Sequence, residues 1–249
     1  MKNGFILLTA LFLMTGCKGS QGPVGPAGNT GSPGTGVQTY SMSFMEGSLP
    51  YSSYTGTLMQ TVDAANPTTS SAVGTLNFSP TTSSASRFLM RWPIKGFIPI
   101  NATIVAASIQ LVTSSTSPGI SKVVGVHQMA VDPSFIWTTA VTWNCVYGLV
   151  IHWDNLNGGP ITFTNGNDYT ATPMSTVTIG PTLASGTRLG WSLSTSLVQT
   201  WINPALSNNG VVFTSEAEGT GESAGSITFG NPASAISYQP VLVVQYTIP

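Results

Sequence analysis

Two arginines and three tryptophans are the side chains of this sequence best suited to holding a ligand. Arg87 and Arg91 lie four residues apart in SRFLMRW, and Trp137, Trp143 and Trp153 lie in or beside expected loops. Exposed aromatic rings stack on sugar rings, and a guanidinium forms paired hydrogen bonds with a carboxylate. Aromatic rings are equally suited to a packed core, so the sequence leaves sugar contact and packing open for each tryptophan.

The two arginines share one face of an expected strand, because side chains alternate along a strand and Phe88 occupies the opposite face. An arginine in the middle of a strand is costly to bury without a partner. Arg87 and Arg91 therefore either pair with acids such as Asp63 or Glu216, or meet an acidic sugar in a groove.

Catalytic motifs are missing. The sequence contains no HExxH, CxxC or GxSxG, and no glycine-rich loop that follows a strand and opens a helix. His127 and His152 have no nucleophile motif beside them. Five acids remain as candidates for the paired carboxylates of glycoside cleavage, and the sequence does not position them: Asp154, Asp168, Glu216, Glu218 and Glu222. The sequence predicts that the protein is not an enzyme.

The amino-acid composition limits the classes of partner that the protein is expected to bind. The 249 residues include seven Lys and Arg against eight Asp and Glu, and charged residues make up only 6% of the chain. A typical globular protein has about 25% charged residues. No basic surface is expected for nucleic acid or anionic lipid. The hydrophobic content of 41% is nevertheless sufficient for a core.

The elements that must position these side chains are strands. Apolar and polar residues alternate in TIVAASIQLV (103–112) and PVLVVQYTI (240–248). Further strands are expected in SAVGTLNF, SRFLMRW, VVGVHQM, GVVFTSE and GSITFG, separated by turns such as TSPG, LNGG, TNGN and LSNNG. The pattern predicts an all-β protein, a β-sandwich or jelly roll of antiparallel strands.

One segment departs from this pattern. In TSLVQTWINP (195–204), Leu197 and Trp201 are four residues apart, Thr195 can cap a helix, and Pro204 ends it. A short helix is therefore expected here, with Trp201 on its buried side.

The N-terminal residues 1–16 form a segment with one lysine near the start, an apolar run, and small residues before Cys17. This layout is that of a secretory signal, and the apolar run is too short to span a bilayer. It resembles the signal peptide of bacterial lipoproteins, with Met14 at the usual leucine position. The resemblance implies that Cys17 is the site of lipid attachment, so the other cysteine, Cys145, is expected to be a free, buried thiol.

A glycine repeat follows at a period of three: Gly19, Gly22, Gly25, Gly28, Gly31 and Gly34. A collagen triple helix of three chains needs this spacing, because only glycine fits at its axis. A flexible Gly/Pro spacer has the same composition. The sequence therefore predicts a stalk over 17–36, either a collagen-like homotrimer or a single-chain spacer, followed by a linker or a first strand over 37–56.

The rest of the chain, 57–249, resembles the DNRLRE domain of extracellular proteins, which is related to alginate-type carbohydrate-binding modules. The resemblance is carried, in order, by SRFLMRWPIKGFIPINATIVAASIQL, VTWN, SLVQTWINPALSNNGVVFTSE and YQPVLVVQYT. The chain departs from the family at Pro93, where an aspartate is usual, at Ser194, where an acid is common, and at Gln239, where arginine is usual.

This resemblance implies a β-sandwich that works outside the cell in carrying or binding, with polysaccharide as the ligand class. It also implies that Asp63 and Glu216, at positions where the family often has acids, could meet across the sandwich at a calcium site. The alternative is that acids of this kind only cap turns.

Together these features predict a protein that is secreted across the inner membrane and lipid-anchored at the cell surface or outer membrane. We expect a structural or adhesive protein that displays a β-sandwich head. The alternative is a carbohydrate-binding module for an extracellular polysaccharide. Exposed aromatic rings in a groove would favour the second function, and fully packed tryptophans the first.

Overall fold

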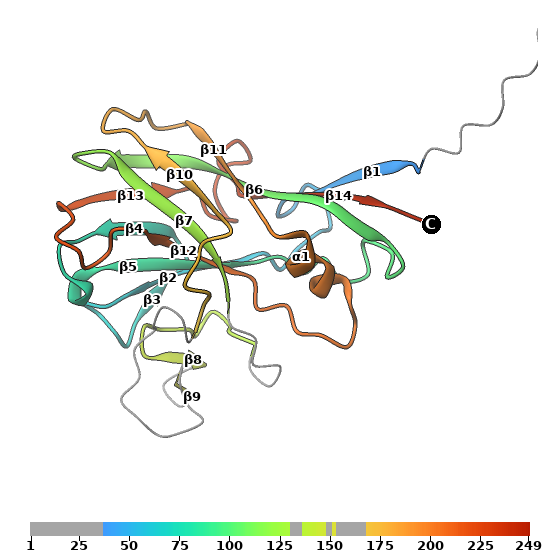
Figure 1. The fold of residues 1–249 in the computed structure, drawn as a ribbon, viewed down its shortest axis with the longest axis horizontal. Coiled ribbons are helices and arrows are strands. Elements are labelled where there is room, and N and C mark those ends of the chain that lie inside the picture. The colour runs from blue at the N-terminus through green and yellow to red at the C-terminus, as the bar shows by residue number, and fades with distance from the viewer. Residues whose placement is uncertain (1–36, 130–135, 148–150, 153–167) are drawn as a thin grey trace, which may run out of the picture. The chain divides into compact units, whose positions relative to one another are not determined.

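Two antiparallel sheets stacked face to face form the head of the protein (Figure 1). The structure, a computed structural model, describes residues 37–129, 136–147, 151–152 and 168–249. Cys17, where lipid attachment is predicted, lies outside these residues, as do the glycine repeat and Trp153. The described strands and one helix confirm the all-β sandwich expected from the sequence.

The first sheet has the order β1-β14-β6-β13-β4, and β11 pairs with β6 beside this path. Its longest strand, β6, pairs with β14 through its first half and with β13 through its second half. The bounds are Thr39–Phe44 (β1), Gly74–Phe78 (β4), Thr103–Ser117 (β6), Arg188–Ser192 (β11), Gly225–Phe229 (β13) and Val241–Thr247 (β14).

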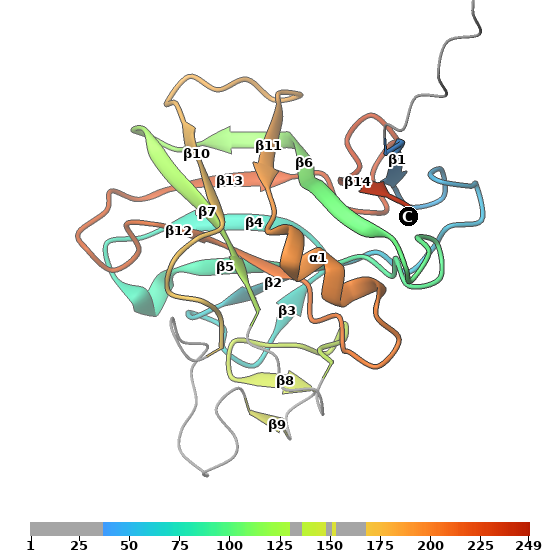
Figure 2. The ribbon, with the colours of Figure 1, turned by 45° about the vertical axis from the view of Figure 1, so that its right-hand side comes forward.

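The second sheet has the order β10-β7-β12-β5-β2-β3. β5 and β7 flank β12, so residues of these three strands lie side by side at the centre of the sheet (Figure 2). The bounds are Leu58–Asp63 (β2), Ser70–Ser71 (β3), Ser86–Arg91 (β5), Lys122–Gln128 (β7), Ser175–Ile179 (β10) and Val211–Ser215 (β12).

The space between the sheets is filled by the alternate apolar residues that the sequence pattern identifies. Phe88, Met90 and Trp92 point inward from β5 and its end, and all three are fully buried. Leu242, Val244 and Tyr246 do the same from β14. The period-two alternation therefore predicts the core correctly in these strands.

A bulge changes this pattern in β6. The register between β6 and β14 shifts between Gln245 and Tyr246, so Ile104 becomes the partner of Tyr246 and is buried. Val105, which strict alternation would place on the same face as the buried Ile109 and Leu111, is 44% exposed. An extra residue in one strand moves the following side chains to the opposite face, and period-two alternation does not predict where this occurs.

A third layer covers the outer face of the second sheet. Met129, Trp137, Trp143 and Tyr169, which come from the connection between β7 and β10, pack on Leu89 and other residues of this face. The two-stranded sheet of β8 (Cys145–Tyr147) and β9 (Ile151–His152) belongs to the same connection. The second sheet is consequently buried on both faces.

The helix α1 spans Thr195–Ile202 and buries Leu197, Val198, Trp201 and Ile202. The expected helix is confirmed, but its cap is not Thr195: the Ser194 hydroxyl accepts a hydrogen bond from the Leu197 N–H at 3.5 Å. Serine is a favourable N-cap because its oxygen accepts from an N–H that has no partner inside the helix. No helix of the described residues is long and apolar enough to cross a membrane.

The head begins earlier than the sequence predicts. Residues 37–249 form one compact unit, and β1 pairs with β14 over its whole length. The linker assignment for 37–56 is therefore wrong where β1 lies, and the alternative of a first strand is confirmed.

Candidate functional site

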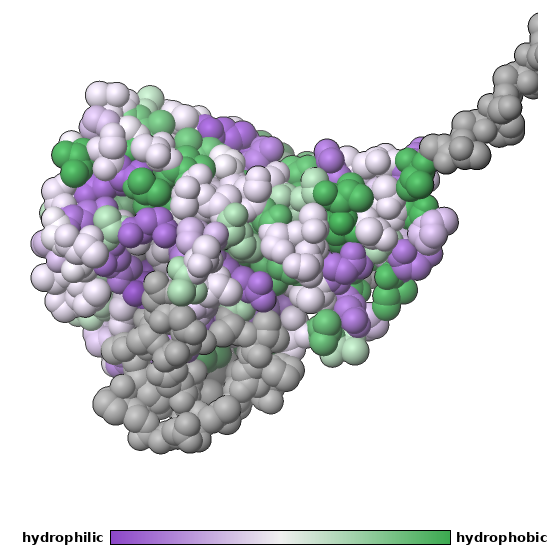
Figure 3. Space-filling view, in the orientation of Figure 1, coloured by the Kyte–Doolittle hydropathy of each residue, from purple (hydrophilic) through white to green (hydrophobic). Residues whose placement is uncertain are grey.

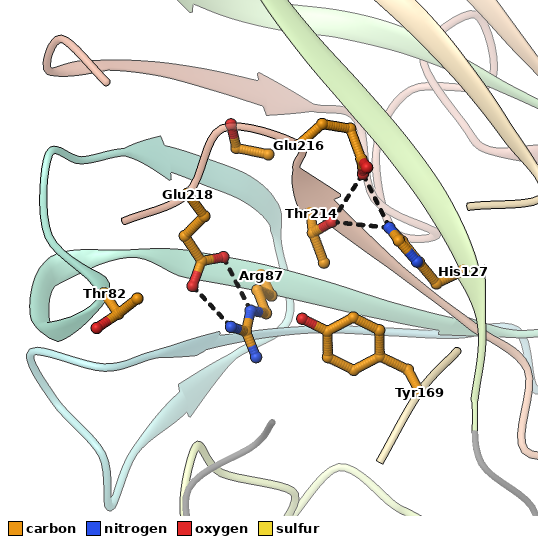
Figure 4. Close-up of a pocket in the computed structure, with 8 residues that line it drawn as sticks. Thr82, Arg87, His127, Tyr169, Thr214, Glu216 and Glu218 are labelled. Carbon is orange, nitrogen blue, oxygen red and sulfur yellow. Dashed lines mark hydrogen bonds and ion pairs between the residues drawn. The ribbon is translucent and has the colours of Figure 1, made fainter. Parts of the chain in front are cut away.

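A polar pocket lies on the outer side of the second sheet (Figure 4). It has a volume of about 170 Å³. Strands β5, β7 and β12 and the connections next to them supply its lining, which comprises Thr82, Arg87, His127, Tyr169, Thr214, Ser215, Glu216 and Glu218. These residues are far apart in the sequence and meet because β12 lies between β5 and β7.

Arg87 forms a bidentate pair with Glu218. Its Nε and Nη2 atoms donate to the two carboxylate oxygens at 3.0 and 2.6 Å, and both side chains are less than 10% exposed. The guanidinium also lies 4.5 Å from the ring centroid of Trp143 and 5.2 Å from that of Tyr169. Of the two alternatives left open by the sequence, the internal ion pair is the one observed, but its acid is neither Asp63 nor Glu216.

His127 and Glu216 form a second pair. The Nε2 atom of His127 lies 2.8 Å from Glu216 Oε1 and 3.1 Å from the Thr214 hydroxyl. Its Nδ1 atom lies 2.7 Å from the carbonyl oxygen of Thr170. A carbonyl oxygen only accepts, so the ring nitrogen Nδ1 donates its hydrogen to the Thr170 carbonyl.

Gly125 makes the contact between His127 and Glu216 possible. A Cβ atom at this position would lie 1.9 Å from Glu216 Oε1 and 3.0 Å from His127 Nε2. The carboxylate of Glu216 thus occupies the space that a side chain at position 125 would fill. Glycine is required here for close approach and not for an unusual backbone angle.

A second ion pair, between Lys122 and Glu222, lies outside the pocket. Their charged atoms are 3.4 Å apart, and the side chains are 1% and 3% exposed. The Ser215 hydroxyl lies 2.8 Å from both carboxylate oxygens of Glu222, and Lys122 donates to the backbone oxygen of Ser223. The lysine is thereby paired and hydrogen-bonded, as a buried charge requires.

All three glutamates belong to the connection between β12 and β13, and all three bases belong to β5 and β7 of the second sheet. In a chain with so few charges, this connection is therefore bound to the sheet by two ion pairs and by the contact between His127 and Glu216. Tyr169 lines the same pocket as Arg87 and His127. Its pKa is raised to about 12, mainly because burial disfavours the phenolate.

The pocket does not have the arrangement of a catalytic triad. A triad needs the acid at one ring nitrogen of histidine and the hydroxyl at the other. Here Thr214 and Glu216 both contact Nε2 of His127. Arg87 and Glu218 neutralise each other's charge within the pocket.

Trp137 and Trp143 are not sugar-binding surfaces in this structure. They are 1% and 5% exposed, and stacking on a sugar needs an open ring face. Trp137 donates from Nε1 to the backbone oxygen of Asn209 at 2.7 Å and packs in the layer on the second sheet. Of the two alternatives left open by the sequence, packing is the one observed for Trp137 and Trp143, and Trp153 lies outside the described residues.

Arg91 differs from Arg87. Its guanidinium carbon lies 5.4 Å from the ring centroid of Trp137, and partial burial lowers the pKa of the guanidinium. The side chain is half-buried, so the rest of its hydrogen-bonding capacity faces solvent. The structure brings Arg87 and Arg91 to the same face of β5, as predicted, but not into one site, because Arg91 does not line the pocket.

Asp63 and Glu216 do not form a calcium site. They lie on the same sheet, not on facing sheets, with β5 between their strands. Asp63 accepts from the backbone N–H of Ala65 at 2.9 Å, which is the turn-capping alternative, and Glu216 binds His127. Within the described residues, no group of three or more acidic, histidine or cysteine side chains is placed to hold a metal ion.

Cys145 is 2% exposed, so the prediction that its side chain is buried is confirmed. The sequence analysis missed Lys122, Tyr169 and the partner role of Glu218. A usable signal for the last was the segment SEAEGTGES, which holds three of the eight acids of the chain.

Comparison with known proteins adds no identification. No protein-family model matches the chain, and no curated protein is detectably similar to it. The likeness to the DNRLRE domain consequently depends on the motifs quoted above.

Proposed function

We propose that the protein is a lipid-anchored surface protein whose β-sandwich head has a structural or adhesive role, carried on the glycine-repeat stalk. The observation that carries the proposal is the packing of the tryptophans. All five within the described residues are at most 5% exposed: Trp92, Trp137, Trp143, Trp191 and Trp201.

Charge distribution supports the same function. Arg87 and Lys122 are used with their glutamates in buried pairs, so two of the few cations of the chain are not open to an ionic ligand. What remains outside is dominated by uncharged residues, as Figure 3 illustrates for one face. A stable head with a neutral, hydroxyl-rich surface suits display outside the cell better than recognition of a charged polymer.

The anchor is tested by fractionating cells that produce the full chain or its Cys17→Ser variant. We expect the parent protein in the membrane fraction and accessible to protease added to intact cells, and the variant to be released or left unprocessed. Equal membrane association of the two chains, or protection of the parent protein in intact cells, would contradict surface display through Cys17.

Carbohydrate binding is tested separately on the same cells. Fluorescent acidic and neutral polysaccharides are added with calcium and then with chelator, and cells without the protein serve as control. We expect no saturable binding above the control. Saturable binding of one polymer would replace the structural function by the carbohydrate-binding alternative, and its loss with chelator would restore a role for calcium.

A further inference from the structure

The edge strand β1 has none of the usual protection against pairing. It lies at the end of the first sheet, and no other described strand pairs with its outer side. Its sequence, TYSMSF, contains no charge and no proline, and its register with β14 has no bulge. Natural edge strands are normally guarded by lysine, proline or a bulge, because their free backbone groups are a template for another chain.

Apolar side chains accompany this edge. Val37 is 70% exposed and Tyr40 is 37% exposed. The Tyr40 ring stacks on that of Tyr246 with centroids 5.6 Å apart, so it is held in place rather than free to turn. Hydrophobic residues gather at the end of the head where β1 and β14 lie (Figure 3). Such an exposed group is more typical of an interface than of a monomer surface.

The sequence before β1 indicates what covers it. The glycine repeat ends at Gly34, and β1 begins at Thr39, five residues later. An extended chain spans at most about 3.6 Å per residue, so each Thr39 lies within about 18 Å of its own Gly34. A triple helix holds three copies of Gly34 at one axis. Three β1 strands would then be close together at an effective concentration in the millimolar range.

We propose that β1, together with Val37, is the surface at which three copies of this chain pack around the axis of the stalk. The inference rests on the proposed function and requires that the stalk over 17–36 has the collagen-like form. Symmetry restricts the contact: antiparallel pairing of two β1 edges is two-fold and leaves a third copy out. The three strands therefore contact through the exposed side chains of Thr39, Tyr40 and Ser41, and the trimer keeps their edges away from other chains.

The test uses the full chain purified from membranes in detergent, with mass measured by sedimentation over a dilution series. In Ser41→Lys, a lysine replaces an exposed serine in the middle of β1 and removes no core contact. The matched control is Thr178→Lys, which places a lysine on β10, the edge strand of the second sheet. Three lysines brought together at one axis repel strongly, whereas three on β10 do not meet.

We expect the parent chain and Thr178→Lys to have three times the monomer mass. Ser41→Lys should need at least a tenfold higher concentration to reach half-trimer. Equal trimer stability in all three chains would overturn the role of β1, and a monomeric parent chain would overturn the trimer. Neither result touches membrane association through Cys17, so failure of this inference is distinguishable from failure of the proposed function.

Discussion

The inner face of the second sheet packs on the first sheet through side chains such as Phe88, Phe213 and Val126, which are all fully buried. The outer face of the same strands combines an apolar layer around Leu89 with the charged pair of Arg87 and Glu218. Removing a side chain from the inner face leaves a cavity, whereas removing one from the pair leaves a charge. The two faces should therefore respond differently to substitution.

The largest effect is expected where the first sheet packs on the inner face of the second, at Trp191 of β11. Trp191 is fully buried, contacts the rings of Phe213 and Phe229 edge-on, and donates from Nε1 to the Val124 carbonyl at 3.0 Å. Trp191→Ala removes these contacts and should lower the free energy of unfolding by about 3 to 5 kcal/mol, measured by urea denaturation. Trp191→Phe, which keeps an aromatic ring, should lose less; an equal loss in both variants would mean that the hydrogen bond and not the packing dominates.

A smaller loss, about 3 kcal/mol, is expected for Glu218→Ala on the outer face, because it removes the bidentate partner of a buried arginine. Replacing both members by apolar residues, in Arg87→Met with Glu218→Leu, should recover most of this loss, because no charge then remains to be solvated. The comparison is made by urea denaturation at low and high salt. A loss below about 1 kcal/mol that disappears at high salt would show that the pair behaves as a surface pair.

The same contrast explains what the sequence predicts and what it does not. Alternation along β5 places Phe88 inside and Arg87 outside, because side-chain direction in a strand is a local property. The partner of Arg87 is 131 residues away in the chain, so the sequence analysis could name an acid only by analogy and chose the wrong ones. Glu218 reaches Arg87 because β12 lies beside β5, which is a matter of strand order and not of local pattern.

The covering layer shows the same limit. The sequence places Trp137 and Trp143 in or beside loops, and loops are normally exposed, so it leaves ligand contact open for them. They are buried because the second sheet presents Leu89, Val62 and Val212 on its outer face as well as an apolar inner face. In the sequence this is visible only as runs without alternation, such as VVF in β12, which are typical of strands buried on both sides.

The smallest effect is expected at Gly125, where the absence of a side chain leaves room for the contact between His127 and Glu216. In Gly125→Ala the new Cβ atom would lie 1.9 Å from Glu216 Oε1, so the carboxylate must leave His127. The Glu216 side chain is 24% exposed and can turn into solvent, which limits the cost to about 1 kcal/mol. Alanine is better than glycine in a strand by about 0.5 to 1 kcal/mol, so the two terms nearly cancel.

Urea denaturation should show little net change, while the ring N–H of His127, followed by NMR, should exchange with solvent faster, as in Glu216→Gln. A loss above 3 kcal/mol would mean that β7 itself must move, and that the outer face is packed as rigidly as the inner one.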